Sequence, residues 1–438
     1  MFMASFAGGA RPFSGKALTS EKPIKEYRPE GQMVYPLLQH QGTPARPIVN
    51  IGDYVLTGQM IAAAEGAVSV PVHATVSGSV LAIEPRLTAG GIMCESVIIE
   101  NDGHFDEIAF PQMKPLQDMS RQEKLQAIHN AGVVGMSGSG YPAALKFSPR
   151  EPERIEYVIA NCIECEPYLT NDYRRMMEEP EFIVSGLHVV LSLFPRARGI
   201  IAVADDKPEA AKRLRSMIKK DPRISIKVLK ASYPLGNDRI LVYACTERAL
   251  HAKMTPADAG CIVSNCDTLV ATYHAVTGGR PSMERIVTIT GDAVKEPGNY
   301  RVRIGTSYKE LLEDAGGFTT EPALILSGGT MTGVPLTDPD VPTTKIASAL
   351  TCLTKDVSAD ILPGDCIRCG LCVDRCPLRL IPAYLADAAE REDRARFAQL
   401  HGNECMNCGV CTWLCPARRK LSQEIVRMQE NIVTGGAA

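Results

Sequence analysis

The chain has no apolar run approaching the roughly 18 residues that a membrane crossing requires. Residues 1–10 also lack the apolar core of a secretory signal peptide. The formal net charge of the 438 residues is only −3 and no basic patch stands out, which argues against nucleic acid as a partner. We therefore expect a protein of a reducing, cytoplasmic compartment with no transmembrane segment of its own, which reaches any membrane through a partner.

What the sequence does have is cysteine, with 15 residues in all. Eight of them form two near-identical C-x2-C-x2-C-x3-C-P runs of the bacterial ferredoxin type, Cys366, Cys369, Cys372 and Cys376, then Cys405, Cys408, Cys411 and Cys415. In such a pair, three thiolates of one run hold a [4Fe–4S] cube and the fourth comes from the other run. We expect one cluster on Cys366, Cys369, Cys372 and Cys415, and the other on Cys405, Cys408, Cys411 and Cys376.

A pair of zinc sites or a disulfide framework is the alternative for these runs. Zinc sites rarely use four cysteines per run with a proline closing each run, so two iron–sulfur clusters are the better interpretation. Two such clusters side by side pass single electrons, and their sensitivity to oxygen points to an anaerobe. Cys162 and Cys165 form a further C-x-x-C, which we interpret as two buried thiols rather than a redox dithiol.

The rest of the chain predicts a multidomain α/β protein. Residues 35–101 contain short alternating segments typical of a lipoyl-type barrel-sandwich hybrid, and the absence of lysine from residues 58–80 leaves no attachment point for a swinging arm. Further along, three strands alternate with three helices, which implies a mainly parallel sheet. The strands are expected at 157–160, 199–204 and 224–229, and the helices at 121–131, 186–193 and 209–219.

Two smaller units follow. A strand at 285–292, a helix at 308–315 and a strand at 323–327 suit a β-grasp-like module. A single helix over 382–400 is expected to separate the two cysteine runs.

A glycine-rich loop at residues 135–140 predicts a nucleotide site. Gly135, Gly138 and Gly140 allow backbone amides to approach a phosphate, and Lys146 adds a positive charge. Tyr141 can stack on a ring. Polar groups also follow the apolar strands, at the edge where open α/β sheets bind ligands; they are Asn161, Glu164 and Glu166, then Tyr233, Gly236 and Asp238, then Ser264 and Asn265.

Motifs at four places, in order along the chain, resemble one family. They are Gly8-Gly9-Ala10-Arg11-Pro12, Pro36-Leu37-Leu38-Gln39-His40-Gln41-Gly42, Glu164-Cys165-Glu166-Pro167-Tyr168-Leu169, and Gly291-Asp292-Ala293-Val294 with Pro297-Gly298-Asn299-Tyr300. With the doubled cysteine runs, the chain resembles the C subunit of the Rnf complex, a membrane-bound, ion-translocating ferredoxin:NAD oxidoreductase. It is more distantly similar to the NADH-binding flavoprotein subunit of respiratory complex I. Arg11, Ser137 and the pair Asn237-Asp238 depart from the family pattern.

The resemblance implies two cofactors besides the clusters, FMN and NAD(H). The implied site residues are Gly135, Gly138, Gly140, Tyr141, Lys146, Asn161, Glu164, Glu166, Tyr233, Gly236, Asp238, Ser264 and Asn265, with Tyr141 and Glu166 on the nicotinamide side. No side chain is expected to act as a catalytic acid or base, because the cofactors supply the chemistry.

The resemblance also implies a domain order and partners. The expected domains are a barrel-sandwich hybrid at 1–120, a Rossmann-like FMN and NADH domain at 121–280, a β-grasp-like SLBB module at 281–340 and a helical ferredoxin-type domain with two [4Fe–4S] clusters at 341–438. The expected partners are the iron–sulfur B subunit and the membrane-embedded subunits, on the cytoplasmic face of the cell membrane. Two alternatives stay open: a soluble reductase of this type that feeds another anaerobic acceptor, and an electron carrier without flavin.

Overall fold

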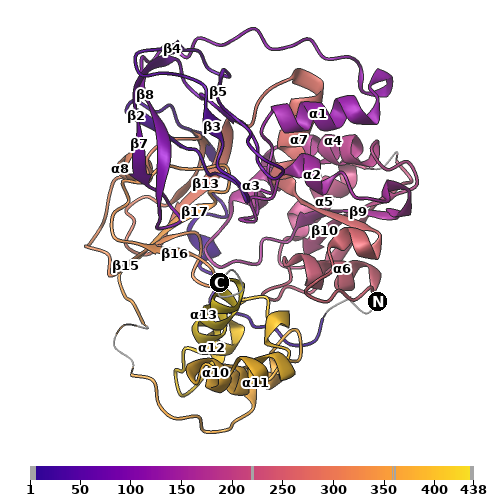
Figure 1. Cartoon of the computed structure of the whole chain (residues 1–438), viewed down its shortest axis with the longest axis vertical. Helices are drawn as coiled ribbons and strands as arrows, with labels where there is room; N and C mark the ends of the chain where they lie inside the picture. Colours follow the sequence, from indigo (N-terminus) through magenta and orange to yellow (C-terminus); the bar gives the residue numbers. More distant parts are fainter. Residues whose placement is uncertain (1–5, 219–220, 358, 360–361, 435–438) are drawn as a thin grey trace.

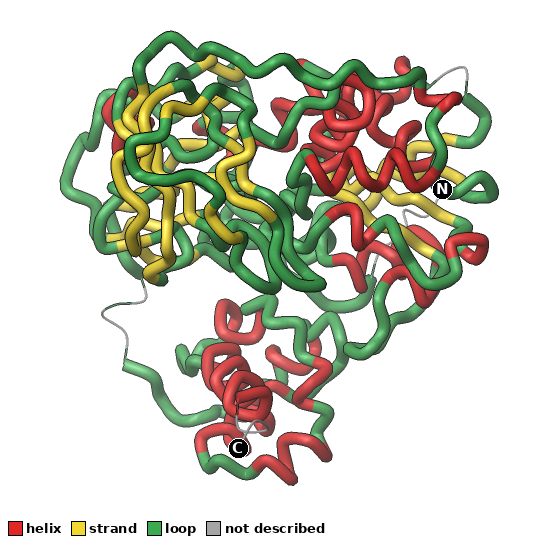
Figure 2. The backbone as a smooth tube through the Cα atoms, turned by 45° about the horizontal axis from the view of Figure 1, so that its top comes forward, coloured by secondary structure: helices red, strands yellow, loops and turns green. Residues whose placement is uncertain are grey.

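The computed structural model describes residues 6–218, 221–357, 359 and 362–434. Figure 1 shows three groups of elements: a strand-rich body, a body in which helices surround a sheet, and a small helical domain formed by the C-terminal part of the chain. Figure 2 shows the same division by secondary structure, with the small domain built of helices and loops. No helix in the described part of the chain is long and apolar enough to cross a membrane.

Two antiparallel sheets form the N-terminal barrel, as the alternating segments predict. One sheet has the strand order β2-β8-β7-β4 and the other β3-β5-β6. The core between them contains Tyr35, Ile61, Val76 and Ile99, all fully buried. The strands are β2 (Gln32–Pro36), β3 (Arg46–Pro47), β4 (Tyr54–Val55), β5 (Met60–Ala63), β6 (Val72–His73), β7 (Gly78–Leu87) and β8 (Met93–Asn101).

The second body contains a four-stranded sheet in which every pairing is parallel. Its strands are β9 (Tyr157–Cys162), β10 (Arg198–Ala204), β11 (Ile224–Leu229) and β12 (Cys261–Asn265), in the order β11-β10-β9-β12. The strand order reverses between β9 and β12. Open α/β sheets bind ligands at the carboxyl edge beside such a reversal.

Helices cover both faces of this sheet, because its strands are apolar on both sides. They are α1 (Arg121–Asn130), α2 (Ala143–Lys146), α3 (Asn171–Glu178), α4 (Pro180–Leu191), α5 (Pro208–Met217), α6 (Asp238–Thr246) and α7 (Cys266–Gly278). The expected strands and helices are found, although the end expected for α5 at Lys219 lies outside the described residues. Helices α4 and α7 pack closely because Gly186 has no side chain: a Cβ there would collide with the carbonyl of Leu269.

A six-stranded sheet follows, in the order β1-β14-β13-β17-β15-β16. Its elements are β1 (Ile24–Glu26), β13 (Glu284–Thr290), β14 (Gly298–Arg303), α8 (Tyr308–Asp314), β15 (Leu324–Ser327), β16 (Val334–Leu336) and β17 (Ala349–Leu353). Strands β1 and β17 lie outside the segment 281–340 expected for this module, and they pair with β14 and β13. Because β13 is buried along nearly its whole length, it requires a neighbour on each side, and β17 supplies the second one.

The C-terminal domain consists of short helices around the two cysteine runs: α9 (Leu371–Asp374), α10 (Pro382–Glu390), α11 (Arg394–Gln399), α12 (Val410–Leu414) and α13 (Leu421–Thr434). The single helix expected over 382–400 is wrong. The chain leaves the helical conformation at Glu392, which has φ 54°, and Asp393 then caps a new helix by accepting from the Arg396 amide at 2.9 Å. The described residues also form single 3₁₀ turns at Lys16–Leu18, Leu116–Asp118, Pro152–Arg154, Pro256–Ala259 and Gly402–Glu404.

Candidate cofactor sites

Two asparagines expected in the site lie side by side at the carboxyl edge of the parallel sheet. Asn161 at the end of β9 and Asn265 at the end of β12 are register partners, and Ser264 pairs with Ala160 one step before them. This is the point where the strand order reverses. The Ser264 hydroxyl is buried and has no hydrogen-bond partner among the described residues, so it is available to a ligand.

The two asparagines are held in place by their own hydrogen bonds. Asn161 donates through Nδ2 to the Gly236 carbonyl at 2.8 Å, and the Gly236 amide donates to Cys165 Sγ at 3.4 Å. Asn265 caps α7 by accepting from the Asp267 amide at 2.9 Å. The structure therefore brings Asn161, Gly236 and Asn265 together, as expected, from three separate segments.

The glycine loop is closed at its base and open at its tip. The Gly135 amide donates to the Tyr141 carbonyl at 2.8 Å, and the Gly140 amide donates to the Gly135 carbonyl at 2.9 Å. Within the described residues, the amides of Ser137, Gly138 and Ser139 donate to nothing. Gly138 has φ 90°, and a Cβ there would meet nothing within 4 Å. A tip of unpaired amides facing open space suits a phosphate group.

A large cavity adjoins this loop. It has a volume of about 1170 Å³, and its lining includes Tyr141, Lys146 and Asp238. Lys146 donates to the Val263 carbonyl at 3.2 Å and pairs with Asp238 at 3.6 Å. The lining also includes further charged side chains: the cationic ones are Arg150, Arg154, Arg248 and Lys253, and the acidic ones are Glu151, Glu156 and Asp258.

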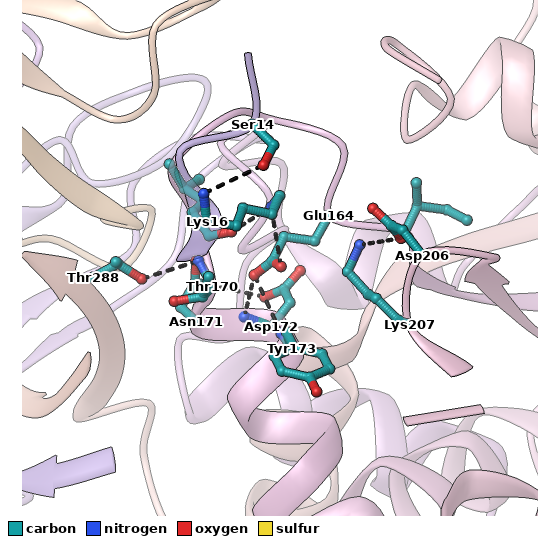
Figure 3. Close-up of polar contacts among 12 residues, drawn as sticks. Ser14, Lys16, Glu164, Thr170, Asn171, Asp172, Tyr173, Asp206, Lys207 and Thr288 are labelled. Carbon is teal, nitrogen blue, oxygen red and sulfur yellow. Dashed lines mark hydrogen bonds and ion pairs between the residues drawn. The ribbon is translucent and has the colours of Figure 1, made fainter. Parts of the chain in front are cut away.

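Glu164 does not face this cavity. Figure 3 shows its carboxylate among the first residues of α3, where it accepts from the amides of Asp172 at 2.7 Å and Tyr173 at 3.2 Å. It also pairs with Lys16 at 3.2 Å. Burial lowers the pKa of Lys16, and the neighbouring Glu164 opposes that shift. Glu164 therefore ties the N-terminal segment to the start of α3, which differs from the expected flavin contact.

Glu166 is also occupied elsewhere. Its carboxylate accepts from the backbone amides of Met331 at 2.7 Å and Thr332 at 3.1 Å, and from the Thr332 hydroxyl at 3.2 Å. Burial raises the pKa of Glu166 while these hydrogen bonds oppose the rise. Because the loop after β15 supplies three donors, Glu166 is turned toward that loop and does not line the cavity beside the glycine loop, whereas it was expected on the nicotinamide side with Tyr141.

The thiols of Cys376, Cys405, Cys408 and Cys411 lie close together, in the crossed arrangement that the two runs predict. Burial raises the pKa of Cys408 to about 12, and the nearby thiols of Cys405 and Cys376 add to the shift. The thiols of Cys405, Cys408 and Cys376 likewise contribute to the raised pKa of Cys411. In the other set, burial and the nearby Cys366 and Cys369 raise the pKa of Cys372, and Cys372 and Cys415 pack against one small apolar cluster.

The spacing of these thiols does not suit zinc. A tetrahedral Zn²⁺ with bonds of about 2.3 Å holds its sulfurs only about 3.8 Å apart. Among the described residues, the only group of three metal-capable side chains whose ligand atoms all lie within 4.8 Å is Asp172, Cys266 and Asp267. No three sulfurs of the described cysteine runs therefore all lie within 4.8 Å of one another, as the three thiolates of a tetrahedral zinc site would.

The second cysteine set lies beside the carboxyl edge of the parallel sheet. The Tyr233 hydroxyl donates to the Cys408 carbonyl at 2.8 Å, and Tyr233 packs with Cys165, Cys408 and Val410 in one apolar cluster. Arg239 at the start of α6 reinforces the contact through Glu404 at 2.7 Å. By contrast, Cys366 and Cys369 of the first run are exposed.

Cys162 and Cys165 do not form a dithiol. Cys162 packs into the apolar cluster on the face of the sheet covered by α4 and α7, whereas Cys165 packs against the cluster on the opposite face. The thiol of Cys162 instead neighbours Cys266, whose pKa is raised first by burial and further by Cys162. Cys162 is buried, as expected, and Cys165 is half-buried; the two thiols lie on opposite faces of the sheet, which agrees with the interpretation that they are not a redox dithiol.

Several residues of the site escaped the sequence analysis. Lys16 comes from the N-terminal segment, Thr268 from the first turn of α7, and Arg285 from β13. Each acts through a contact with a distant segment: Lys16 with Glu164, Thr268 with Met136, and Arg285 with Met136 and Asp267. Local sequence patterns do not identify such contacts.

Comparison with known protein families agrees with this architecture. Models of four families match in order: the RnfC barrel-sandwich hybrid domain at residues 4–104, the Nuo51 FMN-binding domain at 128–274, the SLBB domain at 286–335 and the 4Fe-4S dicluster domain at 361–418. These four domains define a class of electron-transfer oxidoreductase subunit, one with an FMN-binding domain and a dicluster domain.

Three relatives match most of the chain. The C subunit of the Na⁺-translocating ferredoxin:NAD⁺ oxidoreductase complex of Acetobacterium woodii is 37% identical over 390 residues, covering 88% of this chain and 88% of that protein. The proton-translocating counterpart from Clostridium ljungdahlii is 35% identical and covers 89% of this chain and 85% of that protein. The C subunit of the ion-translocating oxidoreductase complex of Rhodobacter capsulatus is 35% identical, covering 87% of this chain and 74% of that protein. The chain therefore belongs to the Rnf C-subunit family.

Proposed function

We propose that this chain is the peripheral electron-transfer subunit of a membrane-bound, Rnf-type ferredoxin:NAD oxidoreductase. FMN, when bound, exchanges a hydride with NAD(H), and two [4Fe–4S] clusters carry single electrons between the flavin and a partner. The observation that carries the proposal is the placement of both amides, Asn161 and Asn265, at the reversal of strand order beside an open glycine loop.

The chain's own groups fit a flavin nucleotide at this edge. The unpaired amides of Ser137, Gly138 and Ser139 suit the phosphate. Lys146, at the end of the helix α2 that follows the loop, adds a positive charge. The buried hydroxyl of Ser264 lacks a partner within the described structure, which supports a polar ligand at that point. These residues bind and orient the flavin rather than take part in the chemistry.

The adjoining cavity suits a dinucleotide. Its volume of about 1170 Å³ exceeds the upper end of the usual range for small-ligand pockets, about 1,000 Å³. Arg154 and Arg248 of its lining pair with Glu151 and Glu156. Arg150 and Lys253 also line it, are exposed, and form no ion pair within 4.0 Å among the described residues, so both can meet a pyrophosphate. Tyr141 lies where the cavity meets the glycine loop.

The cysteine runs suit a relay that begins at the flavin and ends at the surface. The set of Cys376, Cys405, Cys408 and Cys411 adjoins the flavin edge through Tyr233. The set that contains Cys366 and Cys369 reaches solvent, where a partner has access. We place that partner among the other Rnf-type subunits, the iron–sulfur B subunit and the membrane-embedded subunits, at the cytoplasmic face of the membrane. This placement is supported by the three relatives, each of which is named as the C subunit of an ion-translocating complex.

The test is anaerobic purification with flavin and iron quantitation, followed by absorbance measurement as NADH is added. We expect one FMN, about eight irons per chain, the content of two [4Fe–4S] clusters, and bleaching of the flavin band by NADH. Iron without flavin would favour a plain electron carrier. Flavin that NADH reduces, in a chain that never co-purifies with membrane subunits, would favour a soluble reductase for another acceptor.

A further inference from the structure

Arg285 is the largest fully buried side chain among the described residues, and its guanidinium joins three segments. It lies on β13, in the six-stranded sheet rather than in the flavin domain. Nη1 donates to the Asp267 carboxylate at 2.8 Å, Nη2 donates to the Met136 carbonyl at 3.1 Å, and both Nε and Nη2 donate to the Ala347 carbonyl, at 2.9 and 2.7 Å. One side chain thus holds the base of the glycine loop and the first turn of α7 in a fixed relation.

Neighbouring contacts lock the same two elements. The Met136 amide donates to the Thr268 hydroxyl at 2.9 Å, and that hydroxyl donates to the Val134 carbonyl at 3.2 Å. The second oxygen of Asp267 accepts from Arg175 at 2.8 Å. Burial works to raise the pKa of Asp267, but Arg175 and Arg285 outweigh it and the pKa is lowered, so the carboxylate stays charged as an acceptor.

This arrangement leaves the loop tip with a defined position. Met136 is fixed on both sides, through its amide by Thr268 and through its carbonyl by Arg285, directly before the unpaired amides of residues 137–139. On the other side of the tip, the Gln41 amide of the barrel donates to the Gly140 carbonyl at 2.9 Å. The tip is therefore anchored at both ends by residues of other domains.

We infer that Arg285 of the SLBB module is a positioning residue for the flavin phosphate, because it sets the place of the glycine-loop amides relative to Ser264 and Asn265. The inference rests on the proposed function, and it assigns to the SLBB module a part in cofactor affinity. Arginine is required because its planar fork reaches three acceptors at fixed angles, which the single ammonium of lysine does not.

The test uses Arg285→Lys in the full chain, freed of flavin and titrated separately with FMN and with riboflavin, which lacks the phosphate. We expect the dissociation constant for FMN to rise at least tenfold and that for riboflavin to change less than threefold. Arg303→Lys is the matched control, since Arg303 lies on the neighbouring strand β14 and, in the described part of the chain, its guanidinium pairs with Glu284 alone, at 3.3 Å. Its affinities for both flavins should stay within twofold of wild type.

Thr268→Val is the second variant, used because a lysine at 285 could impair folding. It removes the hydroxyl that accepts from the Met136 amide. The dissociation constant should therefore rise more for FMN than for riboflavin. The inference would be overturned if the two variants raised the dissociation constants of FMN and riboflavin equally. Unchanged FMN binding by a folded Arg285→Lys chain would overturn it as well. A wild-type chain that binds neither flavin would overturn the proposed function as well, so the two failures are distinguishable.

Discussion

The hydroxyl of Tyr233 donates a hydrogen bond to the backbone carbonyl of Cys408 at 2.8 Å. This bond joins the loop that precedes α6 to the loop of the second cysteine run. Because the same loop presents Gly236 to Asn161, the cysteine set and the flavin edge share one short segment. The distance between the two proposed cofactor sites is therefore fixed by local backbone geometry rather than by a flexible linker.

Tyr233→Phe removes that hydrogen bond and leaves the ring packing intact. We expect a loss of about 1 kcal/mol in local stability, typical of one buried hydrogen bond. Hydrogen–deuterium exchange of the segment 405–411 should become faster, while flavin and iron contents stay unchanged. Tyr243→Phe is the control, because Tyr243 is 45% exposed on α6. Equal exchange in wild type and Tyr233→Phe would show that the bond does not hold the domains together.

Cys369→Ala tests the cluster assignment. We expect the chain to lose about four irons and keep its flavin, because Cys369 belongs to the exposed set and lies outside the flavin edge. NADH should still bleach the flavin, but transfer to an external acceptor should cease. Cys94→Ala, at a partly exposed cysteine outside both runs, should leave iron and transfer unchanged. Persistent transfer in the Cys369 variant would contradict the assignment.

Gly138→Ala and Ser137→Ala should differ in flavin affinity. Gly138 has φ 90°, a conformation that costs an L-residue at least about 1 kcal/mol, so we expect FMN to bind about fivefold more weakly in Gly138→Ala. Ser137 is exposed and is not among the residues with positive φ, so alanine there should change the affinity less than twofold. Titration of flavin fluorescence measures both. A larger effect at Ser137 than at Gly138 would contradict this account of the loop.

Lys345 predicts a dependence of stability on pH. Its ammonium is fully buried and donates to the carbonyls of Pro71 at 2.7 Å and Gly132 at 2.8 Å, and burial lowers its pKa from 10.5 to about 7. Between these two values the unfolded chain binds more protons than the folded chain, so the free energy of unfolding rises with pH.

Relative to Lys345→Met, wild type should therefore gain stability from pH 7 to pH 9, by at most about 1.4 kcal/mol per pH unit. The two carbonyl acceptors stabilise the ammonium and reduce that slope. Denaturant unfolding at several pH values measures the difference, with Lys309→Met, at an exposed lysine, as the control. A difference that shrank as the pH rose would contradict the prediction.

Local patterns in the sequence were sufficient for part of this protein. The cysteine runs predicted which thiols meet, because ligand spacing within a run is set over a few residues, and Cys376 does join Cys405, Cys408 and Cys411. Three of the four strands of the parallel sheet, β9, β10 and β11, were also predicted, since each is a short apolar run between turns, whereas β12 was not among the expected strands. Asn161 and Asn265 met at the sheet edge because parallel strands end on the same side.

The remainder depends on contacts between distant segments. Glu164 and Glu166 were expected beside the cofactors, but α3 and the loop after β15 supply backbone amides that take up both carboxylates. The interruption at Glu392 follows from one capping carboxylate, Asp393, which competes with helix continuation. Arg285 donates to the carbonyl of Met136, which is 149 residues away in the sequence. The spacing of apolar residues along the chain does not predict a contact between such distant residues.

The N-terminal segment has a consequence for how the chain is made. Ile24 in β1 pairs with Asn299 in β14, and the Gly9 amide bonds to the carbonyl of Arg375. At a synthesis rate of about 5–20 residues per second, the segment emerges from the ribosome tens of seconds before that last partner does. Gly9 therefore reaches this partner only after the chain has been translated as far as the first cysteine run. Docking of this segment and assembly of the cysteine-rich domain thus belong to the same stage of biogenesis.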